Sequence, residues 1–142
     1  DLVGVSFYPF ATLLSSQVET VFAWLRTEFE GFGKPYVISE SGETAEPIVI
    51  EGLGVTIPGS TSLQKIVLTS FLNFADSTDT EFVIWYIARD YEAAFERIRG
   101  EVPDFFRVWQ HSGLIDADGA PRPAFRPWRE RYMAPFVSSE GG

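Results

Sequence analysis

The sequence predicts an α/β fold in which three short parallel strands alternate with helices. Apolar runs rich in Val, Ile and aromatic residues lie at 2–8, 36–40 and 81–88, and such runs are typical of strands buried on both faces of a parallel sheet. Between them, segments 13–32 and 62–76 carry apolar residues at helical spacing. Helices of this length provide the right-handed crossover connections that parallel strands require.

The first predicted helix, residues 13–32, has residues suited to both of its ends. Ser15 or Ser16 is expected to cap its start. Gly31 and Gly33 follow its last apolar turn, where glycine commonly ends a helix. Its apolar positions recur every three or four residues and are Val18, Val21, Phe22, Leu25 and Phe29.

The stretch 41–59 is long and rich in glycine for a connection within a compact domain. Connections of this length are usually functional loops or contain a small hairpin, and we expect the hairpin arms at 49–50 and 55–57. Ser60 or Thr61 is expected to cap the second helix. Beyond the third strand, the sequence predicts a short helix at 104–111, a turn at 116–119, a helical piece near 123–132 and a disordered tail at 137–142.

Composition excludes several classes of function. The 142 residues carry a net charge of −9 and are 45% hydrophobic and 15% aromatic, which indicates one globular domain rather than a disordered chain. The acidic charge argues against nucleic acid as a partner, and the apolar runs fall short of the roughly 20 residues that cross a bilayer. The absence of Cys, a single histidine (His111) and the lack of a phosphate-binding glycine motif predict neither a metal nor a cofactor.

Polar and aromatic residues follow each predicted strand at the point where it ends. Tyr8 ends the first strand, Glu40 the second, and Trp85, Tyr86 and Asp90 lie at or after the end of the third. Because the carboxyl ends of parallel strands meet at one edge of a sheet, these side chains are expected to surround one opening. A carboxylate among aromatic rings is typical of sites that bind and cleave sugars.

Each of these residues also has a purely structural interpretation. Glu40 is equally consistent with a strand-end glutamate held by an arginine or a backbone N–H. Tyr8 and Trp85 have the character of core residues, and Glu43 and Asp90 that of loop residues facing water. The residues alone leave these alternatives open.

Four segments of the chain resemble a known family when they are taken in order. The segments 1–10 (DLVGVSFYPF), 34–42 (KPYVISESG) and 82–86 (FVIWY) resemble strands six, seven and eight of a (β/α)8-barrel glycoside hydrolase. The similarity is closest to the retaining arabinogalactan endo-galactanases and related β-glycanases. Segment 109–128 (WQHSGLIDADGAPRPAFRPW) resembles the turn that precedes the last barrel helix in such enzymes.

This resemblance implies a retaining mechanism in which two carboxylates lie about 5 to 5.5 Å apart across the glycosidic bond. Glu40 matches the nucleophile at the end of strand seven. Tyr8 matches the tyrosine that bonds to the nucleophile and orients it, and Trp85 matches the tryptophan beneath the sugar. Tyr86 and Asp90 would line the opening, and the substrate would be an oligo- or polysaccharide.

The loop at 41–59 matches the segment that selects the glycan in barrel enzymes. On that basis we expect Glu43 or Glu46 to bond to sugar hydroxyls. Tyr91 is a further candidate for the rim of the opening.

The sequence also departs from the family. The acid/base glutamate of these enzymes follows an asparagine, but the one asparagine here, Asn73, lies within a predicted helix, and no Asn-Glu pair occurs. A complete barrel needs about 250 residues. We therefore expect residues 1–136 to be the C-terminal part of a trimmed or processed barrel, catalytically silent alone. Its partner would be the N-terminal part of the barrel or a second copy. The alternatives are a non-catalytic carbohydrate-binding or scaffold fragment and a free-standing small α/β domain.

Overall fold

The computed structural model describes residues 1–12, 17–78 and 80–135. It confirms the α/β class and the three parallel strands. The sheet has the order β1 (Val3–Phe7), β2 (Tyr36–Ser41) and β5 (Thr80–Trp85), so that β2 is central. β5 is shorter than the predicted strand 81–88, because the chain turns away after Trp85 into the loop that returns along 110–122.

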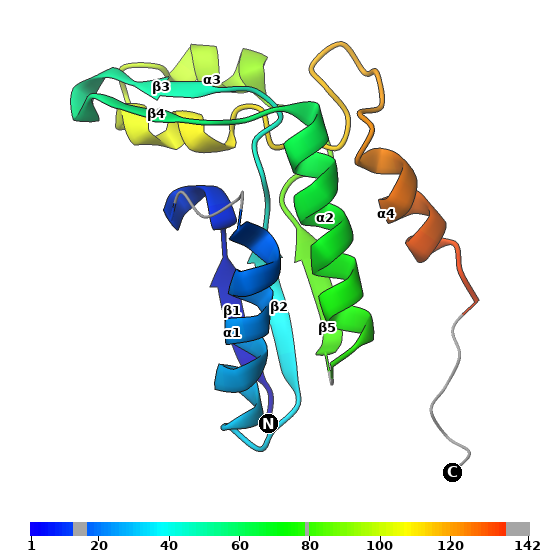
Figure 1. Cartoon of the computed structure of the whole chain (residues 1–142). Coiled ribbons are helices and arrows are strands. Elements are labelled where there is room, and N and C mark those ends of the chain that lie inside the picture. Colours follow the sequence, from blue (N-terminus) through cyan, green and yellow to red (C-terminus); the bar gives the residue numbers. More distant parts are fainter. Residues whose placement is uncertain (13–16, 79, 136–142) are drawn as a thin grey trace.

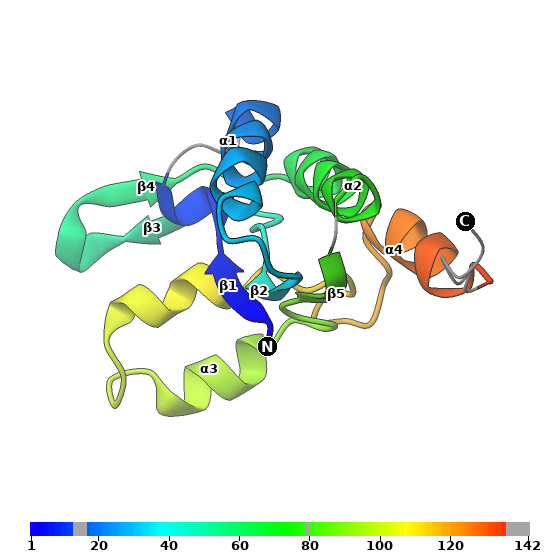
Figure 2. The same ribbon diagram turned by 90° about the horizontal axis from the view of Figure 1, so that it is seen from below.

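Two helices cover one face of this sheet (Figures 1 and 2). They are α1 (Val18–Glu30) and α2 (Thr61–Asp76). The Ser60 side chain caps α2 by accepting a hydrogen bond of 3.0 Å from the backbone N–H of Leu63, as predicted. The caps expected at 15 and 16 lie outside the described residues.

The main core lies between these helices and the sheet, and aromatic rings fill much of it. Phe22 stacks on Phe74 at 5.1 Å, and Phe29 meets Tyr36 at 4.4 Å between ring centroids. The first contact joins α1 to α2, and the second joins α1 to the strand that follows it. Interlocked rings of this kind add roughly 0.5 to 1.5 kcal/mol per pair beyond the burial of their surface.

A second layer lies across the carboxyl ends of the strands, at the top of Figure 1. It includes the short helices η1 (Pro9–Thr12) and η4 (Asp104–Trp109) and the antiparallel hairpin of β3 (Ile48–Ile50) and β4 (Val55–Ile57). The hairpin confirms the prediction for the 41–59 stretch. A short helix, η3 (Glu51–Leu53), joins its arms.

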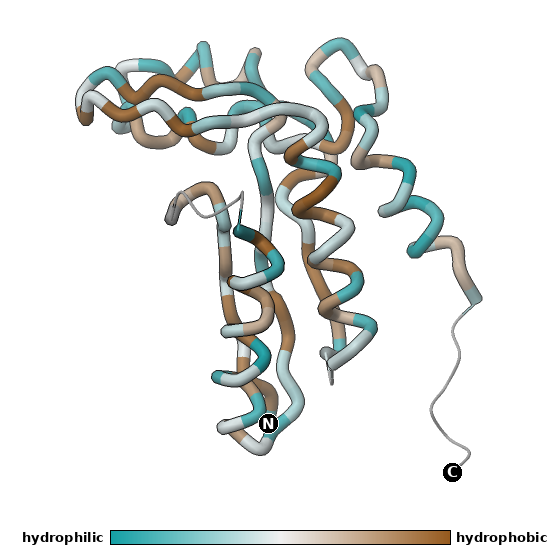
Figure 3. The backbone as a smooth tube through the Cα atoms, viewed as in Figure 1, coloured by the Kyte–Doolittle hydropathy of each residue, from teal (hydrophilic) through white to brown (hydrophobic). Residues whose placement is uncertain are grey.

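This upper layer has an apolar core of its own, and hydrophobic residues continue along the hairpin in Figure 3. The buried members are Phe10, Ile48, Ile50, Ile57 and Val108, with Tyr8 and Trp109 packed against them. This second cluster shares no residue with the main core. It therefore supports the loops at the strand ends independently of the helices.

Two helices complete the chain. α3 (Glu92–Ile98) is not predicted from the sequence, because Phe95 is its one buried residue and gives no periodic pattern. α4 (Phe125–Tyr132) packs against α2 and is shorter than the predicted 123–132 segment. None of the described helices is long and apolar enough to span a membrane. The predicted tail at 137–142 lies outside the described residues.

Along β5, the sheet face opposite α1 and α2 is exposed to solvent. Phe82 and Ile84 of β5 point to this side and are 48% and 47% exposed. Within the described residues, β1 and β5 each pair with β2 alone, so each has one free edge. An apolar sheet face with two free edges is unusual for a monomer.

Candidate functional site at the strand ends

Glu40 lies half-buried near the carboxyl end of the central strand. It pairs in register with Ser6, after a shift between Val5 and Ser6. The next residue, Ser41, is fully buried and pairs with Trp85 of β5. Side chains alternate along a strand, so Glu40 points to the face opposite Ser41.

The hydroxyl of Tyr8 lies beside the carboxylate of Glu40. Burial raises the pKa of Tyr8 well above its usual value, and the hydrogen bond to Glu40 and its negative charge raise that pKa further. Tyr8 Oη and the indole Nε1 of Trp109 are both buried, and the Trp109 N–H beside the Tyr8 oxygen offsets part of this rise in pKa. The Tyr8 hydroxyl therefore has both the Glu40 carboxylate and the Trp109 indole as neighbours.

The Tyr8 ring belongs to a cluster of aromatic rings. The Tyr8 ring lies 5.3 Å from Phe10 and 6.0 Å from Trp109, and Tyr86 lies 6.5 Å from Trp109. The backbone N–H of Tyr86 donates to Ser41 O at 2.7 Å, which fixes its place next to β2. Trp109 is a component that the site prediction missed, because it comes from η4, 69 positions after Glu40.

Tyr86 is also linked to Tyr91, and the peptide bond that follows Tyr86 is cis. Burial raises the pKa of Tyr91, with the charge and hydrogen bond of Tyr86 and then the charge of Asp90 acting in the same direction. That Tyr86 and Tyr91 line one opening stays a prediction.

Trp85 lies in the main core, on the helix-covered side of the sheet. Its ring is 6% exposed and meets Phe71 at 6.0 Å, and its Nε1 donates to Ser112 O at 3.2 Å. The rings that share a cluster with Tyr8 are instead those of Tyr86 and Trp109.

Asp90 is held in a buried ion pair with Arg122. The two contacts measure 2.6 and 2.8 Å, and the side chains are 1% and 6% exposed. The N–H of Gly113 donates to the same carboxylate at 2.7 Å. Burial alone would raise the pKa of Asp90, but hydrogen bonds from His111, Arg122 and Gly113 and the charge of Arg122 together hold that pKa below its usual value. Asp90 therefore fixes the loop behind the site.

His111 is also part of this ion-pair network. Its Nδ1 lies 3.0 Å from Glu92 Oε1 and 3.9 Å from both Asp90 Oδ2 and Glu46 Oε1. The hydrogen bond to Asp90 raises the pKa of His111, burial lowers it, and the charges of Glu46, Glu92 and Asp90 raise it, with a net upward shift.

Asp90, Glu92 and His111 could each offer one metal-ligand atom within 4.8 Å of the others. Arg122 already binds Asp90 through both oxygens, however, and also lies 3.6 Å from Glu46. We therefore interpret the group as an ion-pair network that joins the loops.

The loop after β2 is tied down by buried polar contacts. Glu43 is fully buried, and its Oε1 accepts from the N–H of Thr44 at 3.1 Å. Gln64 of α2, also fully buried, donates to the backbone oxygens of Glu43, Ser112 and Gly113 at 3.1 to 3.3 Å. This single amide links the loop that follows Glu40 to the loop that follows Trp109.

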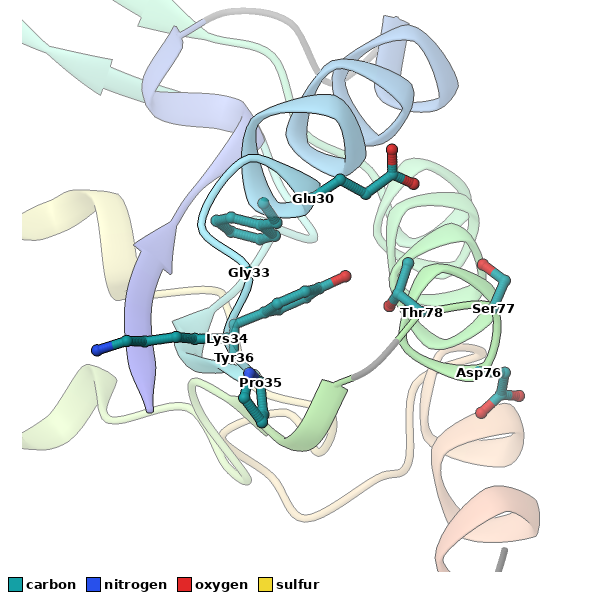
Figure 4. Close-up of a pocket in the computed structure, with 9 residues that line it drawn as sticks. Glu30, Gly33, Lys34, Pro35, Tyr36, Asp76, Ser77 and Thr78 are labelled. Carbon is teal, nitrogen blue, oxygen red and sulfur yellow. The ribbon is translucent and has the colours of Figure 1, made fainter. Parts of the chain in front are cut away.

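A cavity of about 600 Å³ lies at the opposite end of the sheet, between the ends of α1 and α2 (Figure 4). The Tyr36 side chain points into it, whereas Lys34 points away and pairs with Asp1 at 3.6 Å. Its lining residues are Phe29, Glu30, Gly33, Lys34, Pro35, Tyr36, Asp76, Ser77 and Thr78. It is remote from Glu40 and contains none of the predicted site residues.

No family model and no curated protein matches the sequence. Solved structures do match the fold. They include β-glucuronidases from Bifidobacterium dentium, in complex with coumarin-3-O-glucuronide (TM-score 0.68, 19% identity), and from Ruminococcus gnavus (0.65, 19%), each over 97% of this chain. A GH2 β-galacturonidase from Eisenbergiella tayi matches over 99% of it (0.57, 20%).

The chain spans 22% to 25% of the length of these enzymes. At this identity the match shows the fold alone. The described α/β arrangement is therefore one that a segment of these glycosidases also has.

Proposed function

We propose that this chain is the C-terminal portion of a (β/α)8-barrel glycoside hydrolase of the retaining type, with Glu40 as its nucleophile. The observation that carries the proposal is the position of Glu40 at the carboxyl end of the central strand, beside the Tyr8 hydroxyl and within an aromatic cluster. The fold shared with glycosidases supports it.

In this mechanism a carboxylate oxygen of Glu40 attacks the anomeric carbon, and the bond from that carbon to the leaving oxygen breaks. The leaving oxygen takes a proton from an acid that lies outside this chain. Water then attacks the anomeric carbon of the glycosyl–Glu40 ester and gives a proton back to the same outside group, which now acts as a base; this frees the sugar and restores the carboxylate.

The neighbouring side chains have positioning roles in this proposal. Tyr8 donates a hydrogen bond to the oxygen of Glu40 that does not attack. Tyr86 and Trp109 provide apolar ring surface against the sugar, the role that the family resemblance gives to Trp85. Asp90 acts through the loop that it anchors, and Glu43 through the loop after β2.

The rest of the barrel is the partner that we propose for this chain. The exposed Phe82 and Ile84 and the free edges of β1 and β5 are the features that strands from that part would cover. Without it, a second copy of this chain can occupy the same face.

For the substrate we propose a class, the glycosides, and no particular sugar. The sequence resembles endo-galactanases, and the fold neighbours are named for glucuronides and galacturonides. One of these neighbours was solved with an aromatic glycoside.

Labelling with a 2-deoxy-2-fluoro glycosyl fluoride tests the proposal in the longer protein that contains this segment. The leaving fluoride needs no acid, and the glycosyl–enzyme ester accumulates, so peptide mass spectrometry is expected to find the label on Glu40. Glu40→Gln should abolish both labelling and turnover, whereas Glu51→Gln, at an exposed carboxylate in the same 41–59 stretch, should retain them. A label on any other residue would overturn the assignment. The 142-residue chain alone should not hydrolyse aryl β-glycosides.

A further inference from the structure

Two exposed phenylalanines lie at the outer end of the aromatic cluster around Glu40. Phe105 and Phe106 are 45% and 44% exposed. Their ring centroids lie 5.6 and 5.7 Å from Trp109, which lies 6.0 Å from Tyr8. A continuous series of rings therefore extends from the carboxylate to the surface.

Their exposure does not come from a loosely held segment. Val108 of the same short helix is fully buried in the second core. Tyr91 Oη donates to Phe106 O at 3.4 Å, and Arg107 lies 3.8 Å from Asp104 within the helix. The backbone that presents the two rings is thus fixed from both sides.

These rings are also separate from the open face of the sheet. That face is marked by Phe82 and Ile84 of β5, whereas η4 (yellow in Figure 1) lies beside the hairpin, beyond the carboxyl ends of the strands. Phe105 and Phe106 therefore lie on the side from which a substrate reaches Glu40.

We propose that Phe105 and Phe106 bind an aromatic aglycone, the leaving group of a glycoside whose anomeric carbon lies at Glu40. This proposal rests on the proposed function and specifies the substrate class. Aromatic pairs favour edge-to-face contacts at 4.5 to 7 Å, and Phe105 already meets Trp109 in this way, with an interplanar angle of 86°. An aryl group placed against Phe105 and Phe106 extends the same packing.

Kinetics with matched phenyl and methyl β-glycosides in the longer protein test this inference. Phe105→Ala and Phe106→Ala should each lower kcat/KM for the phenyl glycoside about two- to tenfold and leave the value for the methyl glycoside unchanged. Comparing each variant with the parent on the same substrate removes the difference in leaving-group acidity. Trp24→Ala, at a 55% exposed ring on α1, is the control and should affect neither substrate.

The outcomes separate the two proposals. If Glu40→Gln abolishes turnover but the phenylalanine variants change both substrates equally, the aglycone site is wrong and the nucleophile stands. If Glu40→Gln retains turnover, the proposed function is wrong. An equal loss of activity accompanied by a lower Tm would show that another part of the protein covers the rings, which also overturns the aglycone site.

Discussion

Replacing Asp90 by Ala is expected to be among the most destabilising changes in the chain. It would leave the guanidinium of Arg122, whose side chain is 6% exposed, without its bidentate partner, and the N–H of Gly113 without its acceptor. Removing one member of a buried ion pair costs about 3 to 5 kcal/mol. With a urea m-value of about 2 kcal/mol/M, the unfolding midpoint should fall by about 1.5 to 2.5 M.

Urea unfolding followed by far-UV circular dichroism measures this loss. Asp104→Ala is the matched control, because Asp104 is 40% exposed and lies 3.8 Å from Arg107, a pair worth about 0 to 1 kcal/mol. The double variant Asp90→Ala/Arg122→Met should recover at least about 1 kcal/mol relative to the single variant, since it removes the unpaired charge. Equal losses for Asp90→Ala and Asp104→Ala would refute the argument.

Three further predictions concern stability. The raised pKa of His111 means that its protonated form stabilises the fold. This stabilisation is complete below about pH 6.5 and is lost as the pH rises through the raised pKa. The free energy of unfolding should therefore fall from pH 6 to pH 8. In His111→Gln that slope should vanish; an unchanged slope would assign it to another group. Gly59→Ala places a Cβ 2.2 Å from a backbone oxygen, whereas the Cβ of Gly52→Ala meets open space. In urea unfolding, Gly59→Ala should therefore lower the free energy of unfolding by about 1 to 3 kcal/mol, and Gly52→Ala should not. Similar midpoints for the two variants would contradict this. Ser60→Ala removes the cap of α2 and should cost about 1 kcal/mol, with Ser62→Ala as a near-neutral control; a thermal scan showing equal Tm values would exclude the cap.

The regular elements could be predicted because each has a local pattern. The second helix carries its cap at Ser60 and its apolar stripe within one segment, and the parallel direction of the strands follows from the crossover connections. α3 could not be predicted in the same way, since burial of Phe95 alone gives no period.

The candidate site could be predicted only in part, for a geometric reason. Glu40 and Tyr8 stand directly at strand ends, so position along the chain indicates position in space. Trp109 contacts the same region from a segment distant in the sequence, and Asp90 pairs with Arg122, 32 positions away. Neither contact can be predicted from the residues near it in the sequence. Which of Trp85 and Tyr86 faces the site depends on register shifts in β2, which the sequence does not display.

The division of the apolar interior into two clusters with no shared residue has a consequence for dynamics. Structural units that bury separate surfaces can open separately. Amide hydrogens of β3 and β4 should therefore exchange with deuterium through sub-global openings that leave those of β2 protected. Changes to the hairpin can then alter which molecules enter the strand-end region while the underlying sheet keeps its protection.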